Sequence, residues 1–323
     1  MDKVSILVPV YGVEPYIERC SRSLFAQSYP NLEYVFVDDC SPDRSIEVLK
    51  QVMEDYPERQ GAVRIVRHSV NRGLAAARNT ALENASGVFV IFVDSDDWLD
   101  CEAVGAMMMR QVETNSDMVW GQRLMHEDEG ESICQETVYG EKQRLTLHLM
   151  QRTFDHCLTG RLFRRAVFSD HGLRWQEGLD MAEDRYMMTL LTYYSRTYAS
   201  VDCIVYHYER RNPNSMTVVH EGVKRMRYCK EELVNLLLLE QFFSDKEPVY
   251  QQECARCIIE QLRYNMAVAV ECKDRNEYYR LLDDVLRRDG DRGDKSFSLW
   301  IKSRYFWKAL SRSKKQVIRP IKK

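Results

Sequence analysis

Short apolar runs alternate with helical patterns over the first hundred residues, and this alternation restricts the fold more than any other feature of the chain. The runs have the length and the β-branched and aromatic content of buried strands. They cover Val4–Val10, Leu32–Val37, Val63–Val66 and Val88–Val93. Strands that alternate with helices form parallel sheets through right-handed crossovers, with helices on both faces. The sequence therefore predicts a Rossmann-like α/β domain with a mostly parallel sheet.

Helix signals lie between the predicted strands. Pro15 suits the first turn of one helix, and Ser41 followed by Pro42 predicts the N-cap and first position of the next. The segment Gly73–Ala85 is rich in alanine and predicts a third helix.

After the first hundred residues, the predicted secondary-structure pattern changes from mixed to helical. The segment Met107–Tyr208 mixes helical and extended patterns, and we expect it to add strands to the sheet and a wall to a cleft. From about Val223 the pattern is helical, over Leu233–Phe243, Cys254–Val270 and Tyr278–Arg288. With a boundary near Val218, the predicted parts are an α/β domain at 1–217, a helical region at 218–295 and a basic amphipathic tail at 296–323.

Acidic side chains follow two of the predicted strands where each strand ends. Asp38 and Asp39 follow the second strand, and Asp94, Asp96 and Asp97 follow the fourth. In an open parallel sheet, ligands bind beyond the carboxyl ends of the strands, so both groups are expected to face one crevice. Carboxylates gathered there repel one another, and a divalent cation offsets their charge. Mg²⁺ or Mn²⁺, which prefer carboxylate and phosphate oxygens, is therefore the predicted cofactor.

Short motifs in a fixed order carry a family resemblance over about the first 217 residues. They are Val4–Tyr11 (VSILVPVY), Val37–Asp43 (VDDCSPD), Asn71–Asn79 (NRGLAAARN), Phe92–Leu99 (FVDSDDWL), Glu183–Asp184 and Tyr206–Thr217. The ordered set resembles the family 2 glycosyltransferases of the bacterial polysaccharide type, which are inverting enzymes with the GT-A fold. The resemblance does not cover the helical C-terminal part.

The resemblance implies a role for each matching residue. Asp39 matches the aspartate that accepts the uracil N3–H, and Asp184 matches the general base. The positions implied for nucleotide binding are Pro9, Tyr11, Asp38, Asp39, Arg78, Asp94 and Ser95. Those implied for the metal are Asp96, Asp97 and His207. Those implied beside the donor diphosphate or the base are Glu183, Arg210 and Arg211.

Some of these positions have a second interpretation from the residues alone. Tyr11 lies against the base or packs in the core, and Arg210 and Arg211 close over the diphosphate or form a basic surface loop. Two departures from the family pattern, Gly12 and Cys40, are backbone positions more than chemical ones. The segment Asp155–Arg165 lacks the usual Trp, which concerns the acceptor pocket.

The implied activity is transfer of a sugar from a nucleotide diphosphate donor, with UDP favoured by Asp39, to a glycan or lipid-linked acceptor. Inversion by direct displacement needs a base that removes the acceptor proton while the nucleotide leaves from the opposite side. A metal offsets the charge that develops on the leaving diphosphate. The resemblance therefore implies metal-assisted displacement with Asp184 as the base.

Other nucleotide-binding functions require sequence motifs that this chain lacks. A nucleotidyltransferase or a dinucleotide oxidoreductase needs a glycine-rich turn after the first strand, but the turn here reads Tyr11-Gly12-Val13-Glu14. A catalytically inactive relative that acts as a binding or scaffolding subunit stays open as the alternative. The intact Asp39, Asp94 and Asp184 argue against it.

The cysteine content and the N-terminal pattern indicate the cellular compartment of the protein. The chain has 10 Cys without a framework spacing, and the Cys254–Cys257 pair lacks a partner pair for zinc, so buried free thiols in a reducing compartment are expected. The N-terminus shows no secretory pattern, and runs such as Val88–Val93 are too short to cross a bilayer. A cytoplasmic location is therefore expected.

The tail has a charge pattern of its own. From Ser296 to Lys323 it contains Lys and Arg but no Asp or Glu, interleaved with aromatic residues such as Trp300 and Trp307. Such a segment suits an anionic membrane interface, so we predict peripheral attachment to the inner face of the cell membrane. A disordered basic tail is the alternative. Nucleic acid is not an expected partner, because no recognition module accompanies the segment.

Overall fold

The structure is a computed structural model that describes residues 1–135, 142–216 and 223–290. The chain divides into two compact units, Met1–Cys257 and the residues from Ile258 on. The predicted boundary near Val218 and the predicted tail at 296–323 lie outside the described residues and stay predictions.

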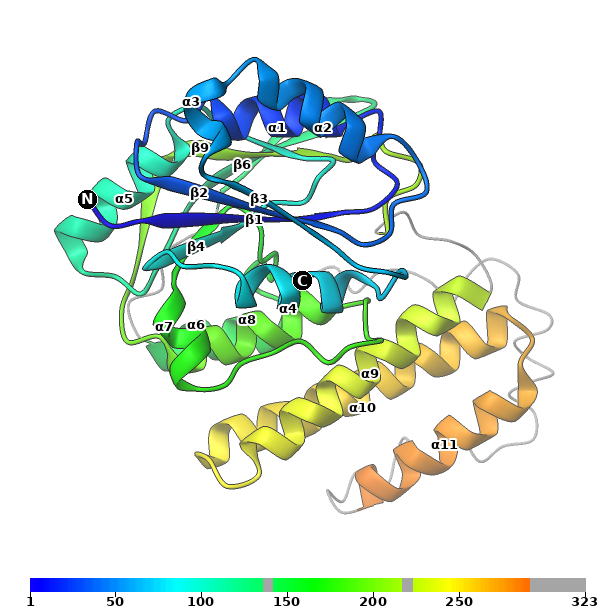
Figure 1. Ribbon diagram of the computed structural model, residues 1–323. Helices are drawn as coiled ribbons and strands as arrows, with labels where there is room; N and C mark the ends of the chain where they lie inside the picture. Colours follow the sequence, from blue (N-terminus) through cyan, green and yellow to red (C-terminus); the bar gives the residue numbers. More distant parts are fainter. Residues whose placement is uncertain (136–141, 217–222, 291–323) are drawn as a thin grey trace. The chain divides into compact units, whose positions relative to one another are not determined.

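One mixed sheet organises the first unit (Figure 1). Its described strands are β1 (Val4–Val10), β2 (Leu32–Asp38), β3 (Val63–Arg67), β4 (Phe89–Phe92), β5 (Trp98–Leu99), β6 (Met118–Glu127), β7 (Gly130–Cys134), β8 (Arg161–Arg164) and β9 (Tyr198–Glu209). Their order is β3-β2-β1-β4-β8-β6-β9-β5, and β7 pairs with β6. β3, β2, β1 and β4 are parallel neighbours, whereas β8 runs antiparallel to both β4 and β6. The predicted α/β class is confirmed, and the middle of the chain adds strands as expected.

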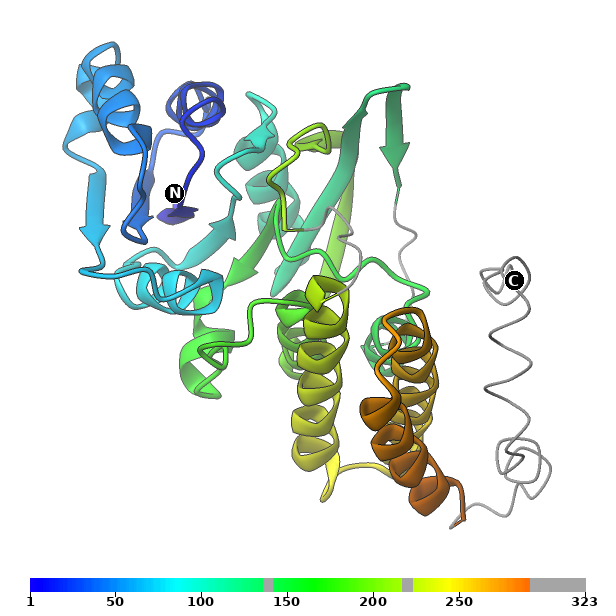
Figure 2. The same cartoon turned by 90° about the vertical axis from the view of Figure 1, so that its right-hand side faces the viewer.

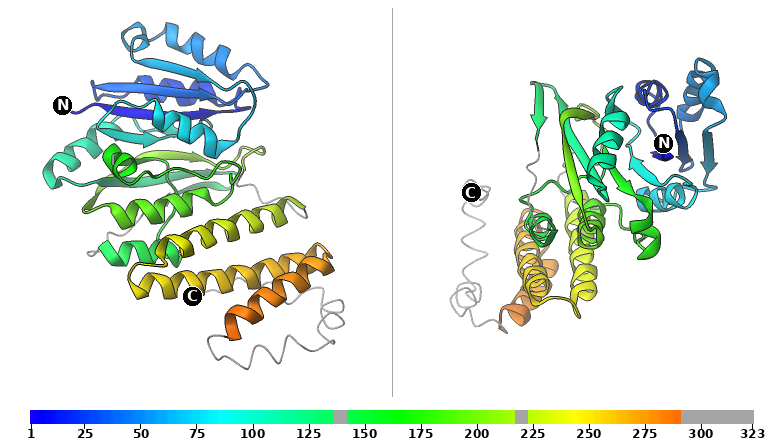
Figure 3. Two further views of the ribbon diagram at one scale, coloured as in Figure 1. Left: turned by 60° about the horizontal axis from the view of Figure 1, so that its bottom comes forward. Right: turned by 90° about the vertical axis from the view of Figure 1, so that its left-hand side faces the viewer.

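Helices cover both faces of the parallel strands. The described helices of the first unit are α1 (Ile17–Phe25), α2 (Ser45–Glu54), α3 (Pro57–Gln60), α4 (Leu74–Glu83), α5 (Ala103–Thr114), α6 (Lys142–Met150), α7 (Arg165–Asp170), α8 (Glu183–Tyr194) and α9 (Val223–Phe243). α1 and α2 lie on one face and α4 on the other (Figures 1 and 2). α8 packs against α6 and α9 (Figure 3). These helices place residues from distant parts of the chain beside the parallel strands.

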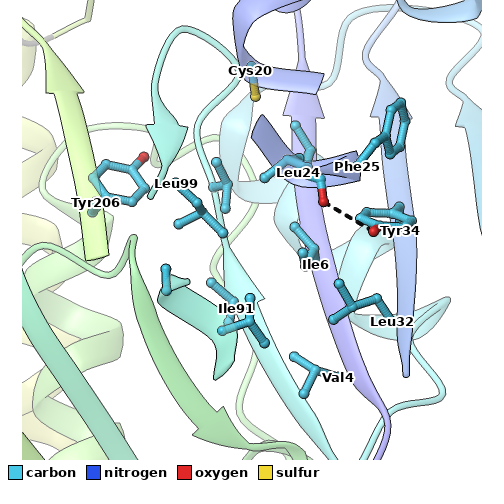
Figure 4. Packing of buried hydrophobic residues seen from close by; sticks show 14 of the residues in the cluster. Val4, Ile6, Cys20, Leu24, Phe25, Leu32, Tyr34, Ile91, Leu99 and Tyr206 are labelled. Atoms are coloured by element: carbon cyan, nitrogen blue, oxygen red, sulfur yellow. Dashed lines mark hydrogen bonds between the residues drawn. The ribbon is translucent and has the colours of Figure 1, made fainter. Parts of the chain in front are cut away.

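The main apolar core lies between the sheet and α1 (Figure 4). Ile6 of β1 and Leu24 of α1 are fully buried there. The rings of Phe25 and Tyr34 meet edge to face with centroids 5.0 Å apart. Tyr34 also donates a hydrogen bond of 3.1 Å from its hydroxyl to the Leu24 carbonyl. This packing fixes α1 on the strands whose carboxyl ends carry the acidic residues.

The C-terminal helices match the predicted helical region. α10 (Pro248–Glu271) has residues in both compact units, and α11 (Arg275–Gly290) belongs to the second. Cys254 and Cys257 are buried free thiols in α10. None of the described helices combines the length and the apolar character that a bilayer span requires.

The predicted start of the second helix is wrong. α2 begins at Ser45, so Ser41 and Pro42 precede it. The Ser41 amide donates to Asp38 Oδ1 at 2.8 Å, and its hydroxyl accepts a bond of the same length from the Gly12 amide. Ser41 is therefore used to join the turns after β1 and β2. Asp43 accepts the Ser45 amide at 3.1 Å and satisfies the start of α2 instead.

Glu33 joins the beginnings of the parallel strands. Its carboxylate accepts hydrogen bonds from Ser86 Oγ at 2.6 Å, the Gly87 amide at 3.0 Å and the Ser5 hydroxyl, and Lys3 Nζ lies 2.8 Å away. Burial alone raises the pKa of Glu33, but the bonds from Lys3, Ser5 and Ser86 outweigh it and lower that pKa to about 2. The folded state is therefore stabilised by the ionised form.

Replacing Glu33 by glutamine should lower the free energy of unfolding by about 1–3 kcal/mol near neutral pH, because buried donors lose a charged acceptor. The wild-type advantage is fully present above the unfolded pKa of about 4.3 and fades as the pH falls through the folded value. Urea unfolding of both proteins near neutral pH and at about pH 3 measures this. Exposed Glu47, paired with Arg44, provides the matched Glu47→Gln control. A difference between wild type and Glu33→Gln that stays constant with pH would contradict the assignment.

Candidate active site

The carboxyl ends of β2, β1 and β4 lie next to one another, because β1 pairs in parallel with both neighbours. Asp38 is the last residue of β2, and Asp94 comes two residues after the end of β4 at Phe92. β2 and β3 lie on one side of β1 and β4 lies on the other, so the strand order reverses at β1. Ligands of open α/β sheets bind at such a point. The fold brings both acidic groups to this edge of the sheet.

Of the residues at this edge that were predicted to bind the nucleotide, Pro9, Ser95 and Asp38 are buried and Tyr11 is exposed. Pro9 is buried in β1 and Ser95 is buried after β4, whereas Tyr11 is 50% exposed. Core packing of Tyr11 is therefore not observed, and its ring is available to a ligand. Asp38 accepts the Ser41 amide and is buried, so it supports the turn.

Asp39 sits in a buried cluster of donors. Its Oδ1 accepts the Arg72 amide at 2.8 Å and lies 2.6 Å from His68 Nδ1, and its Oδ2 accepts the Gly73 amide at 2.8 Å. The other ring nitrogen of His68 lies 2.9 Å from Thr80 Oγ1. A carboxylate oxygen can accept two hydrogen bonds, so Oδ2 keeps the capacity for one more N–H donor.

Gly73 lets two turns approach closely at the beginning of α4. Its φ is +89°, and a Cβ at this position would lie 2.4 Å from Asp180 Oδ2. The Asp180 carboxylate accepts the Ala75 amide at 3.0 Å and so satisfies the N-terminal end of α4. The segment before α8 is therefore joined to the Asp39 turn through Gly73.

The variant Gly73→Ala should lower the free energy of unfolding by about 1–3 kcal/mol, since it combines backbone strain with a clash against Asp180. Gly172→Ala is the matched control, because Gly172 has φ +61° but nothing within 4 Å of the added Cβ. Thermal unfolding of both variants separates the two causes. Equal losses for the two variants would show that only backbone strain matters and that the close approach does not.

Arg78 of α4 lies at the centre of a carboxylate cluster. Its side chain is 1% exposed. One terminal nitrogen donates to Glu183 Oε1 at 2.6 Å and to Asp184 Oδ1 at 2.5 Å, and the other donates to Asp94 Oδ1 at 3.2 Å. Residues from the end of β4 and from the first turn of α8 are thereby held on one guanidinium.

The charges in this cluster do not balance. The pKa of Asp94 is raised to about 6, because burial and the carboxylates of Asp184 and Asp96 together outweigh the lowering effect of Arg78. Burial also raises the pKa of Glu183, again helped by Asp184. One guanidinium thus faces more negative charge than it neutralises, which favours a proton on Glu183 or an additional cation nearby.

The turn after β4 divides its aspartates between two roles. Asp97 is 1% exposed and accepts the Tyr206 hydroxyl at 2.6 Å and the Glu209 amide at 2.7 Å, which ties the turn to β9. Asp96 is partly exposed and accepts the Asn212 amide group at 2.9 Å on Oδ2 only. The predicted contact of Asp97 with a metal stays a prediction, and Asp96 has the more accessible carboxylate.

A metal ion at this edge of the sheet would need carboxylate oxygens that are not already used by the protein. Among the residues that the structure describes, no group of three or more His, Cys, Asp or Glu side chains is arranged to hold an ion. Mg²⁺ commonly uses one or two carboxylates and completes its shell with water and substrate phosphates. Within the part of the chain that the structure describes, Asp94 Oδ2 and Asp96 Oδ1 accept no hydrogen bond from another residue and fit that use.

The described residues of the Tyr206–Thr217 motif contact other protein groups. The His207 ring stacks on Trp98 with centroids 4.9 Å apart, and its Nδ1 lies 3.1 Å from His126 Nε2. Arg210 pairs with Glu127, and Arg211 donates to Glu209 Oε1 at 2.6 Å. In this arrangement the two arginines bind protein carboxylates, and their predicted closure over a diphosphate stays a prediction. Thr217, at the end of this motif, lies outside the described residues.

The segment that leads into α8 is fixed from two sides. Asn79 of α4 exchanges a pair of hydrogen bonds with the backbone of Trp175, at 2.9 and 3.0 Å. Glu231 of α9 accepts the Asp180 amide at 3.0 Å and the Met181 amide at 3.1 Å. Leu158 donates its amide to Asp184 Oδ2 at 3.2 Å. Asp184 is consequently held in place while its side chain stays 18% exposed.

Some residues of the site escaped the sequence analysis. His68 directly follows β3, so the rule that selected Asp38 and Asp39 could have found it. Arg19 of α1 donates to the Asp96 carbonyl at 3.2 Å and lies over the Trp98 ring, 3.6 Å from its centroid. Arg19, Asp180 and Asn212 carry no local signal, because only the tertiary fold brings them to this edge.

Comparisons with known proteins agree with this architecture. The model of the glycosyl transferase family 2 matches residues 5–172. The glycosyltransferase EpsJ of Bacillus subtilis is 31% identical over 224 residues, which cover 67% of this chain and 63% of EpsJ. The chain thus matches less than two thirds of that relative's length.

Solved structures show the same fold. The crystal structure of Staphylococcus aureus TarS 1–349 in complex with UDP-GlcNAc superposes with a TM-score of 0.69 at 20% identity, covering 88% of this chain and 81% of that chain. The mannosyltransferase PcManGT from Pyrobaculum calidifontis, in complex with GDP-Man and Mn²⁺, gives 0.53 at 17% identity, with coverages of 96% and 86%. The likeness confirms the predicted GT-A fold. Because the family model covers more than half of the sequence, the chain belongs to glycosyl transferase family 2.

Proposed function

We propose that the protein transfers a sugar from a nucleotide diphosphate donor, most simply a UDP-sugar, to a hydroxyl group of a glycan or lipid-linked acceptor. The anomeric carbon is inverted, Asp184 is the general base, and a divalent metal assists the departure of the nucleotide. Family membership supports the reaction class.

The observation that carries this proposal is the Arg78 cluster. Asp94 at the sheet edge and Asp184 at the start of α8 bind the same guanidinium, at 3.2 and 2.5 Å. A base that serves a sugar donor must stand beside the donor site, within reach of the acceptor hydroxyl. The cluster supplies that proximity between residues far apart in the sequence. Arg78 is 16 positions before Asp94 and 106 positions before Asp184, so the two aspartates are 90 positions apart.

Asp184 has the access that a base requires. One of its oxygens accepts Arg78 and the other accepts the Leu158 amide, and each oxygen has a further lone pair. In a direct displacement, the acceptor oxygen bonds to the anomeric carbon, the bond to the diphosphate oxygen breaks, and the acceptor proton passes to Asp184. The attack comes from the face opposite the leaving group, and this inverts the configuration.

Asp96 is the proposed metal ligand, with Asp94 beside it. The excess of negative charge at this edge favours a cation, and the accessible oxygens suit Mg²⁺ or Mn²⁺ shared with a diphosphate. When bound, such an ion stabilises the charge of the departing nucleotide diphosphate. The Mn²⁺ named in the PcManGT complex is consistent with this choice.

The proposed donor and the proposed acceptor are supported by different observations. The free capacity of Asp39 Oδ2 suits a single N–H donor such as uracil N3–H, and the TarS complex contains UDP-GlcNAc. Another relative at 26% identity is a poly(ribitol-phosphate) β-glucosyltransferase, which makes a polymeric acceptor reasonable for this chain.

Nucleotide release from a panel of UDP- and GDP-sugars, with Mn²⁺ or with EDTA, tests the donor and the metal together. We expect release from a UDP-sugar that depends on metal and increases with an acceptor. Proton NMR of the product tests inversion, because an α-linked donor should give a β-glycoside. Retention of configuration would reject Asp184 as a simple base.

Location is proposed from the sequence of the tail. Residues 296–323 carry basic and aromatic residues without acidic ones, and we propose that they attach the protein to the cytoplasmic face of a membrane. Sedimentation with anionic liposomes should fall severalfold when the residues after Ser296 are deleted. Equal sedimentation of the full and shortened chains would reject the attachment.

A further inference from the structure

We infer that Glu231 and Asn235 of α9 are positioning residues for sugar transfer, and that they hold the backbone from which α8 and the proposed base Asp184 begin. The inference rests on the proposed function, in which Asp184 removes the acceptor proton. α9 begins at Val223, after the last motif of the family resemblance at Tyr206–Thr217. A helix beyond those motifs is thereby given a part in the reaction.

Two side chains of α9 bind the backbone directly before α8. The Oε2 atom of Glu231 accepts the Asp180 amide at 3.0 Å and the Met181 amide at 3.1 Å. Asn235, about one helical turn further along α9, donates from Nδ2 to the Met181 carbonyl at 3.0 Å. Glu231 is 8% exposed and Asn235 is 4% exposed, so water has little access to these three hydrogen bonds. We call them the α9 clamp.

The residue that follows the α9 clamp has a backbone conformation that L-amino acids rarely adopt. Ala182 has φ +57° and ψ 19°, in the left-handed region that a Cβ atom disfavours. Such a conformation persists only where the surrounding structure fixes it. α8 starts at Glu183, and Asp184 is its second residue. The direction of the Asp184 side chain therefore depends on the turn at Ala182 and on the clamp before it.

α9 buries carboxylates on the face that meets this segment. Glu232, next to Glu231, is 2% exposed and pairs with Arg185 of α8 at 3.0 Å. Carboxylates lose hydration when they are buried, and well-packed apolar side chains in their place are often at least as stable. Hydrogen bonds have a direction that apolar contacts lack. These carboxylates therefore supply a defined placement of α9 against the start of α8, which stability alone does not require.

The α9 clamp has a direct consequence for the reaction. Without the acceptor on Glu231, two amides before α8 lose their partner, and Ala182 can relax toward a right-handed conformation. The first turn of α8 would then shift Asp184, and a displacement of about 1 Å from the reacting atoms lowers rates by about 100-fold. The Asp180 carboxylate keeps its bond to the Ala75 amide, so the turn beside the donor should persist.

Glu231→Leu and Glu231→Gln test the inference in the full chain. Leucine has a similar volume but no acceptor, so kcat of sugar transfer should fall about 100-fold, while the Kd of a UDP-sugar in calorimetry with Mn²⁺ should change less than about threefold. Glutamine keeps an oxygen that can accept both amides, so its kcat should stay within about fivefold of the wild type. Equal losses in the two variants would overturn the inference, and so would weakened donor binding with an unchanged kcat.

Glu277→Leu is the matched control for Glu231→Leu. Glu277 of α11 is 9% exposed and pairs with Arg280 of its own helix, as Glu231 pairs with Arg227 of α9. It belongs to the second compact unit, whereas the α9 clamp belongs to the first. Its kcat should equal that of the wild type. A loss as large as that of Glu231→Leu would overturn the inference, because kcat would then report the stability of the helices in general.

A double variant separates positioning of Asp184 from an independent effect. If Glu231 acts through Asp184, Glu231→Leu should add little to the loss already caused by Asp184→Asn, whereas independent roles would multiply. Multiplied losses would overturn the inference and leave the proposed function intact. Full activity of Asp184→Asn would instead reject the proposed function.

Folding is checked by circular dichroism and thermal unfolding, and kinetics are measured well below the unfolding transition of each variant. Should Glu231→Leu not fold, Asn235→Ala breaks the α9 clamp at the Met181 carbonyl alone. Its kcat should fall about 10-fold with an unchanged donor Kd, since one of the three hydrogen bonds is lost. Wild-type kcat in the folded Asn235→Ala variant would then overturn the inference.

Discussion

Asp184→Asn should lower kcat of sugar transfer by about 10²–10⁴-fold, because an amide cannot take the proton of the acceptor hydroxyl. The substitution keeps the size of the side chain and an oxygen that can accept the Arg78 donor, so the fold and the binding of donor should persist. Coupled measurement of nucleotide release with acceptor present gives kcat, and calorimetry with a UDP-sugar gives the Kd.

Asp170→Asn is the matched control for Asp184→Asn, since Asp170 is an exposed carboxylate at the end of α7. Its kcat should equal that of the wild type. A wild-type protein without transfer or donor hydrolysis, yet with intact donor binding, would instead favour the alternative of a catalytically inactive binding subunit. Comparable activity of Asp184→Asn and wild type would place the base elsewhere.

Removal of the divalent metal, or of its proposed carboxylate in Asp96→Asn, should lower kcat/KM by about 10²–10³-fold. The departing diphosphate then develops charge without a cation beside it, and the donor loses a bridge to the protein. Activity after EDTA treatment should return when Mn²⁺ is added back to the wild type, and should return only weakly in Asp96→Asn.

Asp202→Asn is the matched control for Asp96→Asn, because it also removes one carboxylate charge. Asp202 of β9 is exposed, and it accepts the Gln122 side-chain amide at 2.6 Å. Its metal dependence should match that of the wild type. Full activity of the EDTA-treated enzyme would reject metal assistance, while a metal requirement that Asp96→Asn leaves unchanged would move the ion to other ligands.

The positions of the parallel strands could be predicted from the sequence, because local patterns determine them. Buried strands such as Val4–Val10 must be apolar along their whole length, and turns must follow them. The end of β4 predicted in this way lies within one residue of its place in the structure, at Phe92 instead of Val93. Since the parallel strands share a direction, the aspartates after them had to meet at one edge.

The same local reasoning failed at Ser41, where a side chain was used for something else. A serine before a proline is a common start of a helix, but Ser41 instead joins Gly12 and Asp38 across two turns. That choice depends on a contact across 29 positions of sequence, which no local pattern contains. At the start of α2, the Ser45 amide donates to the Asp43 carboxylate instead.

By itself, the sequence determined the strand and helix types, the edge of the sheet where the acidic residues gather, and the family to which their order belongs. The tertiary structure decided which of those residues share a partner: Asp94 and Asp184 through Arg78, and Asp97 with Tyr206. The physical reason is that periodicity and turn chemistry act over a few residues. Burial and pairing of charges depend instead on packing between segments far apart in the chain.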